Sequence, residues 1–206
     1  MIARLIAITP PGFFSRHDCQ SIVMQALGGG RAAIMLREKS AVSDADLFES
    51  CRWLRPLTTA CGAQLIVNRR IGLARMLGAD GIHLGANGPA IAEARAALGE
   101  GAVIGWSAHS VREALDAFAD GADYVTLSPI YETPGKGRPL GLEPLRELTG
   151  KTQSPVIALG GIGPERIGEV MRAGAYGIAA IRSVFGRPDP AAAVARILER
   201  IGMDHF

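Results

Sequence analysis

A serine and a histidine stand two residues apart in the segment GWSAHS, residues 105–110, directly after the apolar residues 102–104. In an extended chain, residues i and i+2 point to the same side, so Ser107 and His109 are expected to face one direction. The pair suggests a nucleophile with its base, a proton shuttle, or two ordinary residues at a strand end. A hydrolytic triad also needs an orienting acid and an oxyanion hole. Because no G-x-S-x-G elbow surrounds Ser107, the sequence argues against a hydrolase.

The elements that must position this pair are short and regular. Eight apolar runs, each nearly free of polar residues, are typical of parallel strands buried on both faces: LIAIT, AAIMLR, LIVN, GIHLG, AVIGWS, YVTLS, PVIALG and GIAAIR. Helical patterns lie between them, in DADLFESCRWL, IGLARML, PERIGEVMRAGA and PAAAVARILERI, and Pro164 and Pro190 suit first turns. This order predicts a single compact (β/α)8 TIM barrel over residues 1–206. A doubly wound open sheet is the alternative, but its G-x-G-x-x-G segment after the first strand is missing.

Composition excludes several classes of protein. The net charge is +2 with no run of basic residues, which argues against nucleic acid or a membrane surface as the main partner. Three cysteines without C-x-x-C spacing disfavour a disulfide framework or a zinc site. No apolar stretch approaches the roughly 18 residues of a membrane span, so we expect a cytoplasmic protein. A homodimer formed through exposed barrel helices remains open.

Polar residues gather where the apolar runs end, and this is the end at which barrel enzymes carry their active sites. The residues at these positions are Arg37 and Lys39, Asn68, Ser107 and His109, and Thr133 and Lys136, after the second, third, fifth and sixth runs. His83 lies within its run and is expected to be a packing residue. Since acids are few here, we expect an anionic substrate, and we expect it to be bound by Arg37, Lys39, Asn68, Ser107, Thr133 and Lys136.

The last two runs predict where a phosphate group binds. LGGIG, residues 159–163, and IRSVFG, residues 181–186, follow the seventh and eighth runs. Gly160 and Gly161 would let backbone N–H groups approach a phosphate, and the turn at Arg182 and Ser183 would add more donors. A tight turn without a ligand is the alternative for the two glycines alone, but the paired motif favours phosphate binding.

Taken in order, these segments resemble the thiamine phosphate synthase/TenI superfamily over nearly the whole chain. The resemblance rests on MLREKS, LIVNRRIGLA, GIHLG, GWSAHSVREA, YVTLSPIYETPGKGRPLG, VIALGGI and GIAAIRSVF together. It implies a barrel that holds the phosphate of a thiazole phosphate. Synthases of this superfamily join a pyrimidine diphosphate to that molecule with Mg²⁺, whereas TenI-type tautomerases isomerise a carboxythiazole phosphate without metal.

The chain departs from the synthase pattern at the expected metal ligands. Synthases carry Q-x-R-x-K after the second strand, and here Met35 replaces the glutamine. Arg69 and Gly88 stand where the two Mg²⁺-binding aspartates are expected, and Ala86 replaces a second glutamine. Because Mg²⁺ prefers carboxylate oxygens, these changes weaken the metal-dependent interpretation. Whether Arg69 binds a diphosphate in place of the metal stays open.

Three hypotheses follow from the resemblance. The favoured one is a thiazole tautomerase with no metal and no cofactor, in which His109 moves the proton and Ser107 supports it. Arg37, Lys39 or Lys136 would meet the substrate carboxylate. The alternative is a thiamine phosphate synthase, which would require Mg²⁺. A third is a protein that binds the thiazole phosphate without catalysis.

Overall fold

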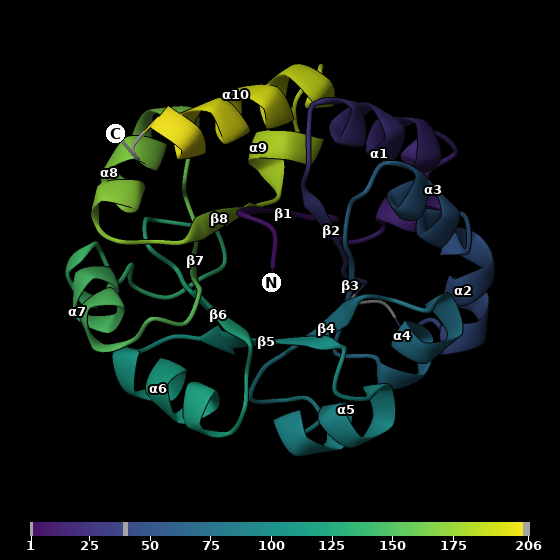
Figure 1. Cartoon of the computed structure of the whole chain (residues 1–206). Helices are drawn as coiled ribbons and strands as arrows, with labels where there is room; N and C mark the ends of the chain where they lie inside the picture. The colour runs from purple at the N-terminus through teal and green to yellow at the C-terminus, as the bar shows by residue number, and fades with distance from the viewer. Residues whose placement is uncertain (1, 39–40, 204–206) are drawn as a thin grey trace.

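The chain forms a closed barrel of eight parallel strands surrounded by helices, as Figure 1 shows in a computed structural model. The structure describes residues 2–38 and 41–203. Each strand pairs with the next, and β1 closes the ring against β8. The strands are β1 (Leu5–Ile8), β2 (Ala33–Leu36), β3 (Leu65–Asn68), β4 (Gly81–Leu84), β5 (Val103–Ala108), β6 (Tyr124–Leu127), β7 (Val156–Leu159) and β8 (Gly177–Ala180). The predicted (β/α)8 barrel is therefore confirmed, and every strand falls on a predicted apolar run.

Helices occupy the outside of the barrel. They are α1 (Cys19–Gly28), α2 (Asp44–Cys51), α3 (Leu54–Ala60), α4 (Ile71–Leu77), α5 (Ile91–Leu98), α6 (Val111–Ala119), α7 (Glu143–Lys151), α8 (Ile167–Arg172), α9 (Arg182–Phe185) and α10 (Pro190–Met203). Two short 3₁₀ turns, η1 (Phe13–Ser15) and η2 (Pro164–Arg166), precede α1 and α8. Pro164 and Pro190 begin η2 and α10, as predicted for residues of a first turn.

One predicted helix is divided in two. The pattern DADLFESCRWL suggests a continuous helix, but α2 ends at Cys51 and α3 begins at Leu54. The indole N–H of Trp53 donates to the carbonyl oxygen of Ser50, at 2.9 Å. In a continuous helix the N–H of Leu54 would bond that oxygen, so the indole competes with the next turn.

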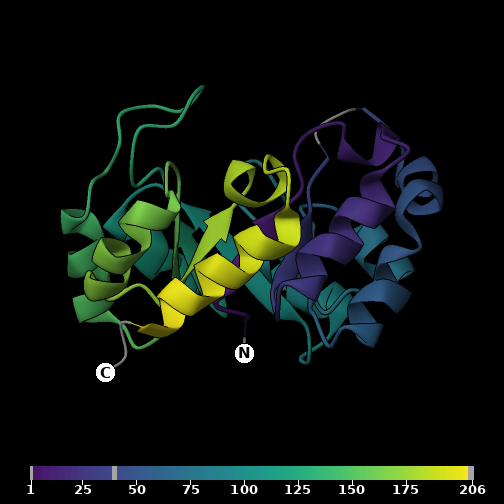
Figure 2. The same ribbon diagram turned by 90° about the horizontal axis from the view of Figure 1, so that it is seen from above.

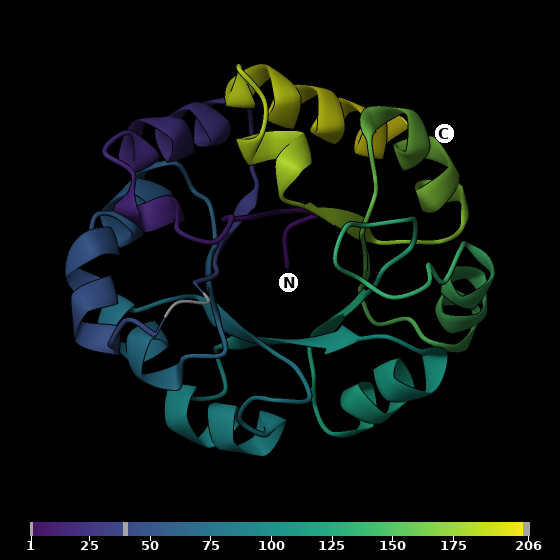
Figure 3. The same cartoon turned by 180° about the vertical axis from the view of Figure 1, so that it is seen from behind.

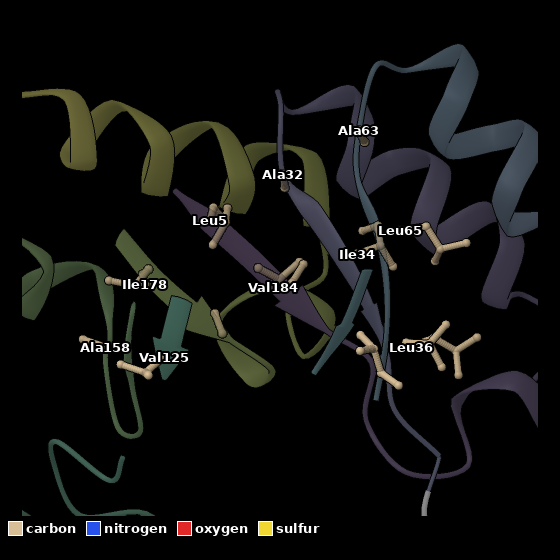
Figure 4. Packing of buried hydrophobic residues seen from close by; sticks show 14 of the residues in the cluster. Leu5, Ala32, Ile34, Leu36, Ala63, Leu65, Val125, Ala158, Ile178 and Val184 are labelled. Atoms are coloured by element: carbon tan, nitrogen blue, oxygen red, sulfur yellow. The ribbon is translucent and has the colours of Figure 1, made fainter. Parts of the chain in front are cut away.

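The apolar core has two layers because successive strand residues point to opposite faces. Leu5, Ile34 and Leu65 belong to the outer layer, which fills the space between the strands and the helices (Figure 4). Ile6, Met35 and Ile66 belong to the inner layer, inside the barrel. Burial on both faces explains why the strand sequences are almost continuously apolar.

All eight carboxyl ends of the strands lie at one rim of the barrel, which we call the mouth. Figure 2 shows the long loop between β6 and α7, drawn in green, projecting from this rim, and Figure 3 shows the same ring of elements from behind. Within the described residues, no helix combines the length and apolar character needed to cross a membrane.

A polar layer interrupts the inner core below the mouth. The strand register sets His83 beside Gly105, and Gly105 beside Tyr124. The rings of His83 and Tyr124 stack with centroids 5.4 Å apart, and a β-carbon on Gly105 would overlap both rings. Gly105 is therefore required because two rings occupy the volume that its side chain would fill.

Gly105→Ala is expected to lower the free energy of unfolding by about 1–3 kcal/mol, because the added methyl group overpacks the two rings. The measurement is urea denaturation at pH 7. Gly150→Ala is the matched control. Gly150 lies in α7, and a β-carbon added there would meet no other atom within 4 Å. That control should gain about 0.5–1 kcal/mol from helix propensity. A Gly105→Ala protein as stable as the wild type would contradict the packing.

Candidate functional site

The structure gathers the predicted phosphate-binding residues around one cavity. A cavity of about 510 Å³ lies at the ends of β7 and β8, and Gly160, Gly161, Arg182 and Ser183 line it. Thr133, from the β6–α7 loop, lines the same cavity. Residues separated by about fifty positions in the chain thus meet at one side of the mouth, in the place where barrel proteins commonly bind phosphate.

The glycine turn after β7 depends on having no side chains. Gly160 and Gly161 both have positive φ angles, of 105° and 64°. A β-carbon on Gly161 would lie 2.7 Å from the carbonyl oxygen of Glu132 and 2.8 Å from the β-carbon of Tyr131. Any other residue would clash with the β6–α7 loop, so the two glycines allow that loop to pack against the turn.

The carbonyl groups of this turn are already occupied. Gly160 O accepts from Tyr131 N at 3.0 Å, and Gly161 O accepts from Arg166 Nη1 at 2.9 Å. Ile162 O accepts from Ser183 Oγ at 2.9 Å. In the described part of the chain, no acceptor takes the N–H groups of Gly161, Ile162 or Ser183. The turn therefore has N–H groups left to donate to an anion, as a phosphate-binding turn requires.

The hydroxyl group of Ser183 is engaged within the turn, where it donates its proton to Ile162 O. A phosphate oxygen accepts hydrogen bonds, so Ser183 would have to contribute its backbone N–H instead. Arg182 is exposed at the rim of the cavity.

A side-chain clamp that the sequence did not reveal holds the glycine turn. The Arg166 guanidinium lies over the ring of Tyr131, with its carbon 4.3 Å from the centroid, while it donates to Gly161 O. Tyr131 OH donates to Glu169 Oε1 at 2.5 Å. Desolvation and this carboxylate raise the pKa of Tyr131, so its proton stays on the ring oxygen. The only feature of the sequence that could have indicated this contact is that Arg166 follows the glycines closely, in GGIGPER.

His109 lies just beyond β5, and its hydrogen bonds fix its tautomer. Its Nδ1 lies 2.7 Å from the carbonyl oxygen of Ser128, which can only accept. Nδ1 therefore carries the proton in the neutral ring, and Nε2 is left with a lone pair. The backbone N–H of His109 donates to Glu113 Oε2 at 2.8 Å, and Ser110 caps α6 through Glu113 N. The exposed ring is thus held at the mouth with a basic nitrogen available.

Ser107 and His109 are not in hydrogen-bond contact in the structure. Ser107 Oγ lies 2.9 Å from Nε2 of His83, and no hydrogen bond joins it to His109. His83 is buried, and its Nδ1 bonds the hydroxyl of Tyr124 at 3.0 Å. Burial, with a smaller effect of Arg69, lowers the pKa of His83 to about 3. His83 is buried, as predicted for a packing residue, and it also forms a hydrogen bond with the Ser107 hydroxyl.

The other predicted substrate-binding residues lie on the opposite side of the mouth from the cavity or in the β6–α7 loop. Arg37 follows β2 and is half-buried, and Asn68 ends β3, where its side-chain amide donates to His83 O at 3.1 Å. Lys136 is exposed in the loop, where its backbone N–H donates to Thr133 O. Lys39 lies outside the described residues.

The residues at the ends of β3 and β4 do not fit a divalent cation. Arg69 follows Asn68, and Ala86 and Gly88 follow β4, so no carboxylate stands at these positions. Among residues 2–38 and 41–203, no three histidine, cysteine or acidic side chains come close enough to hold a metal ion. A hard cation such as Mg²⁺ needs oxygen ligands that these positions do not supply.

Comparisons with known proteins agree on one family. The family model TMP-TENI, described as thiamine monophosphate synthase, matches residues 5–184. A putative thiamine-phosphate synthase of Geobacter sulfurreducens is 42% identical over 177 residues, which are 84% of this chain and 83% of that protein. The thiamine-phosphate synthase of Chloroflexus aurantiacus is 37% identical over 197 residues, which are 94% of this chain and 90% of that protein.

A solved structure supports the same comparison. Thiamine phosphate pyrophosphorylase from Pyrococcus furiosus superposes with a TM-score of 0.88 at 32% sequence identity. The superposition covers 98% of this chain and 97% of that chain.

Acid is expected to destabilise the protein partly through His83. The folded pKa is about 3, whereas an unfolded histidine has a pKa of about 6.5. Between these values the unfolded chain binds the extra proton, so the free energy of unfolding falls by up to about 1.4 kcal/mol per pH unit as the pH decreases. Urea denaturation from pH 7 to pH 4 should show that the free energy of unfolding declines less steeply for His83→Gln than for the wild type.

His17→Asn is the control for this slope. Because His17 is exposed, the free energy of unfolding of this variant should decline with pH as steeply as that of the wild type. An identical slope for His83→Gln and the wild type would mean that His83 is not held neutral by the fold.

Proposed function

This chain belongs to the thiamine monophosphate synthase family, and from that premise we propose that it catalyses the coupling reaction for which its relatives are named. A pyrimidine diphosphate would be joined to a thiazole phosphate. The bond from the pyrimidine's methylene carbon to the thiazole forms as the bond to pyrophosphate breaks, and pyrophosphate leaves with the electron pair. The observation that carries the proposal is the 37–42% identity to proteins named thiamine-phosphate synthase over most of the barrel.

Two anion-binding features at the mouth support this reaction. The glycine turn after β7 offers backbone N–H groups, and Arg37 follows β2. In a ring of eight strands, β7 lies opposite β3, next to β2, so these features face each other across the mouth. The thiazole phosphate would bind at the glycine turn, and the diphosphate would bind near Arg37. Such an arrangement holds two anionic substrates with their reactive ends directed toward each other.

His109 has a place in this scheme between the two anion-binding features. Its tautomer leaves Nε2 with a lone pair at the mouth, where the nitrogen can accept a hydrogen bond or a proton from a substrate. Lys136, in the β6–α7 loop that packs against the glycine turn, would add positive charge at the mouth.

A thiazole tautomerase remains the second candidate because of two specific observations. His109 presents the basic nitrogen that proton transfer requires, and the ends of β3 and β4 do not supply ligands for a divalent cation. The relatives' names favour the synthase, whereas these local features favour the tautomerase. The synthase is therefore the first candidate, and one preparation of the protein can be assayed both for coupling and for isomerisation.

With pyrimidine diphosphate and thiazole phosphate, the protein is expected to form thiamine phosphate and release an equal amount of pyrophosphate, both measured by chromatography. Arg37→Ala should lower kcat/KM at least about ten-fold, since a charge-assisted hydrogen bond contributes about 1.5–3 kcal/mol. Arg112→Ala is the control, because Arg112 pairs with Asp116 on the exposed face of α6.

The same preparation is also given the carboxythiazole phosphate tautomer. Isomerisation that His109→Asn abolishes, with no thiamine phosphate formed from the other substrates, would replace the synthase by the tautomerase. Tight binding of the thiazole phosphate with neither reaction would indicate a binding protein.

A further inference from the structure

Arg69 holds an unusual backbone conformation at the end of β3. Its φ angle is 64°, in the left-handed region, and it is the one described non-glycine residue with a positive φ. For such a residue this conformation costs about 1–2 kcal/mol. The backbone N–H of Arg69 and the side chain of Asn68 both donate to the carbonyl oxygen of His83. Backbone strain that neighbouring residues maintain at a barrel mouth is typical of functional positions.

Two glycines after β4 leave room for the Arg69 side chain. A β-carbon on Gly88 would lie 3.5 Å from Cγ of Arg69, and one on Gly85 would lie 3.5 Å from its Nη2. The same position on Gly85 is 3.8 Å from Ser107 Oγ. The arginine therefore extends from β3 across the end of β4 toward Ser107, and its guanidinium lies over the rim of the barrel.

Arg37 and Arg69 each follow one of two neighbouring strands, β2 and β3, which are paired with Leu36 opposite Val67. Burial, and secondly the like charge of Arg69, lower the pKa of Arg37, while the nearby Glu38 carboxylate acts in the opposite direction. Within residues 2–38 and 41–203, neither guanidinium makes a salt bridge or a side-chain hydrogen bond. The nearby Glu38 carboxylate accepts from Gly12 N at 3.0 Å. Two guanidinium groups in this position would repel each other unless a multiply charged anion bound between them.

We propose that Arg69 takes the place of a divalent cation, so that Arg37 and Arg69 bind the diphosphate of the pyrimidine substrate without metal. The identity of that substrate rests on the function proposed above, whereas the class of ligand, a diphosphate, rests on the two guanidinium groups. Each guanidinium can donate two parallel hydrogen bonds to phosphate oxygens. Both stay charged as the pyrophosphate leaves, so they stabilise its negative charge as a metal ion would.

Titration calorimetry with inorganic pyrophosphate in excess EDTA tests the proposal. The wild type is expected to bind it without added metal, and Arg69→Asn is expected to weaken the Kd at least about ten-fold. Asparagine tolerates the left-handed conformation, so this variant should melt at or above the temperature of the wild type. Arg112→Asn is the matched control and should bind pyrophosphate as the wild type does.

Three results would overturn the proposal: pyrophosphate binding that requires Mg²⁺, binding that Arg69→Asn leaves unchanged, or no binding of pyrophosphate either in EDTA or with added Mg²⁺. Its failure can be told apart from failure of the proposed function. Metal-free binding that depends on Arg69, with no thiamine phosphate formed in the coupling assay, supports the diphosphate site and rejects the synthase. Thiamine phosphate formed only with Mg²⁺ supports the synthase and rejects the role of Arg69.

Discussion

Closure of eight parallel strands into a ring is the constraint on which the site depends. Because all strands run in one direction, every strand delivers the residues that follow it to the same rim. The glycine turn after β7, His109 after β5 and the arginines after β2 and β3 are therefore brought to one mouth, although they lie far apart in the chain. Pairing of β1 with β8 also fixes which of them face each other.

The site is supported from below by polar groups inside the barrel. His83 connects Tyr124, deep in the core, with Ser107 near the mouth, and Gly105 leaves space for the two rings. On the other side of the mouth, Arg166 donates to the Gly161 carbonyl and lies over the ring of Tyr131, whose hydroxyl donates to Glu169. Both networks fix the positions of backbone or side-chain groups at the mouth, which is a common way to preorganise a binding site.

The strands and the gathering of residues at the mouth could be predicted from sequence because each depends on a short local pattern. Apolar runs define strands, and the barrel then places whatever follows them. The partner of Ser107 could not be predicted, since it depends on the register that sets β4 against β5. Likewise, the clamp of Arg166 on Tyr131 joins η2 to the β6–α7 loop, and no periodicity in the chain indicates that contact. The division between α2 and α3 coincides with one indole hydrogen bond, which the apolar pattern does not indicate.

The central claim is that the mouth binds two anions on opposite sides and needs no metal ion for either. A crystal structure of the protein grown in EDTA with thiazole phosphate and inorganic pyrophosphate tests it most directly. The account predicts a phosphate group within hydrogen-bond distance of the N–H groups of Gly161 and Ser183, and pyrophosphate between the Arg37 and Arg69 guanidinium groups. Pyrophosphate bound away from Arg69, or both ligands bound at the glycine turn, would contradict it.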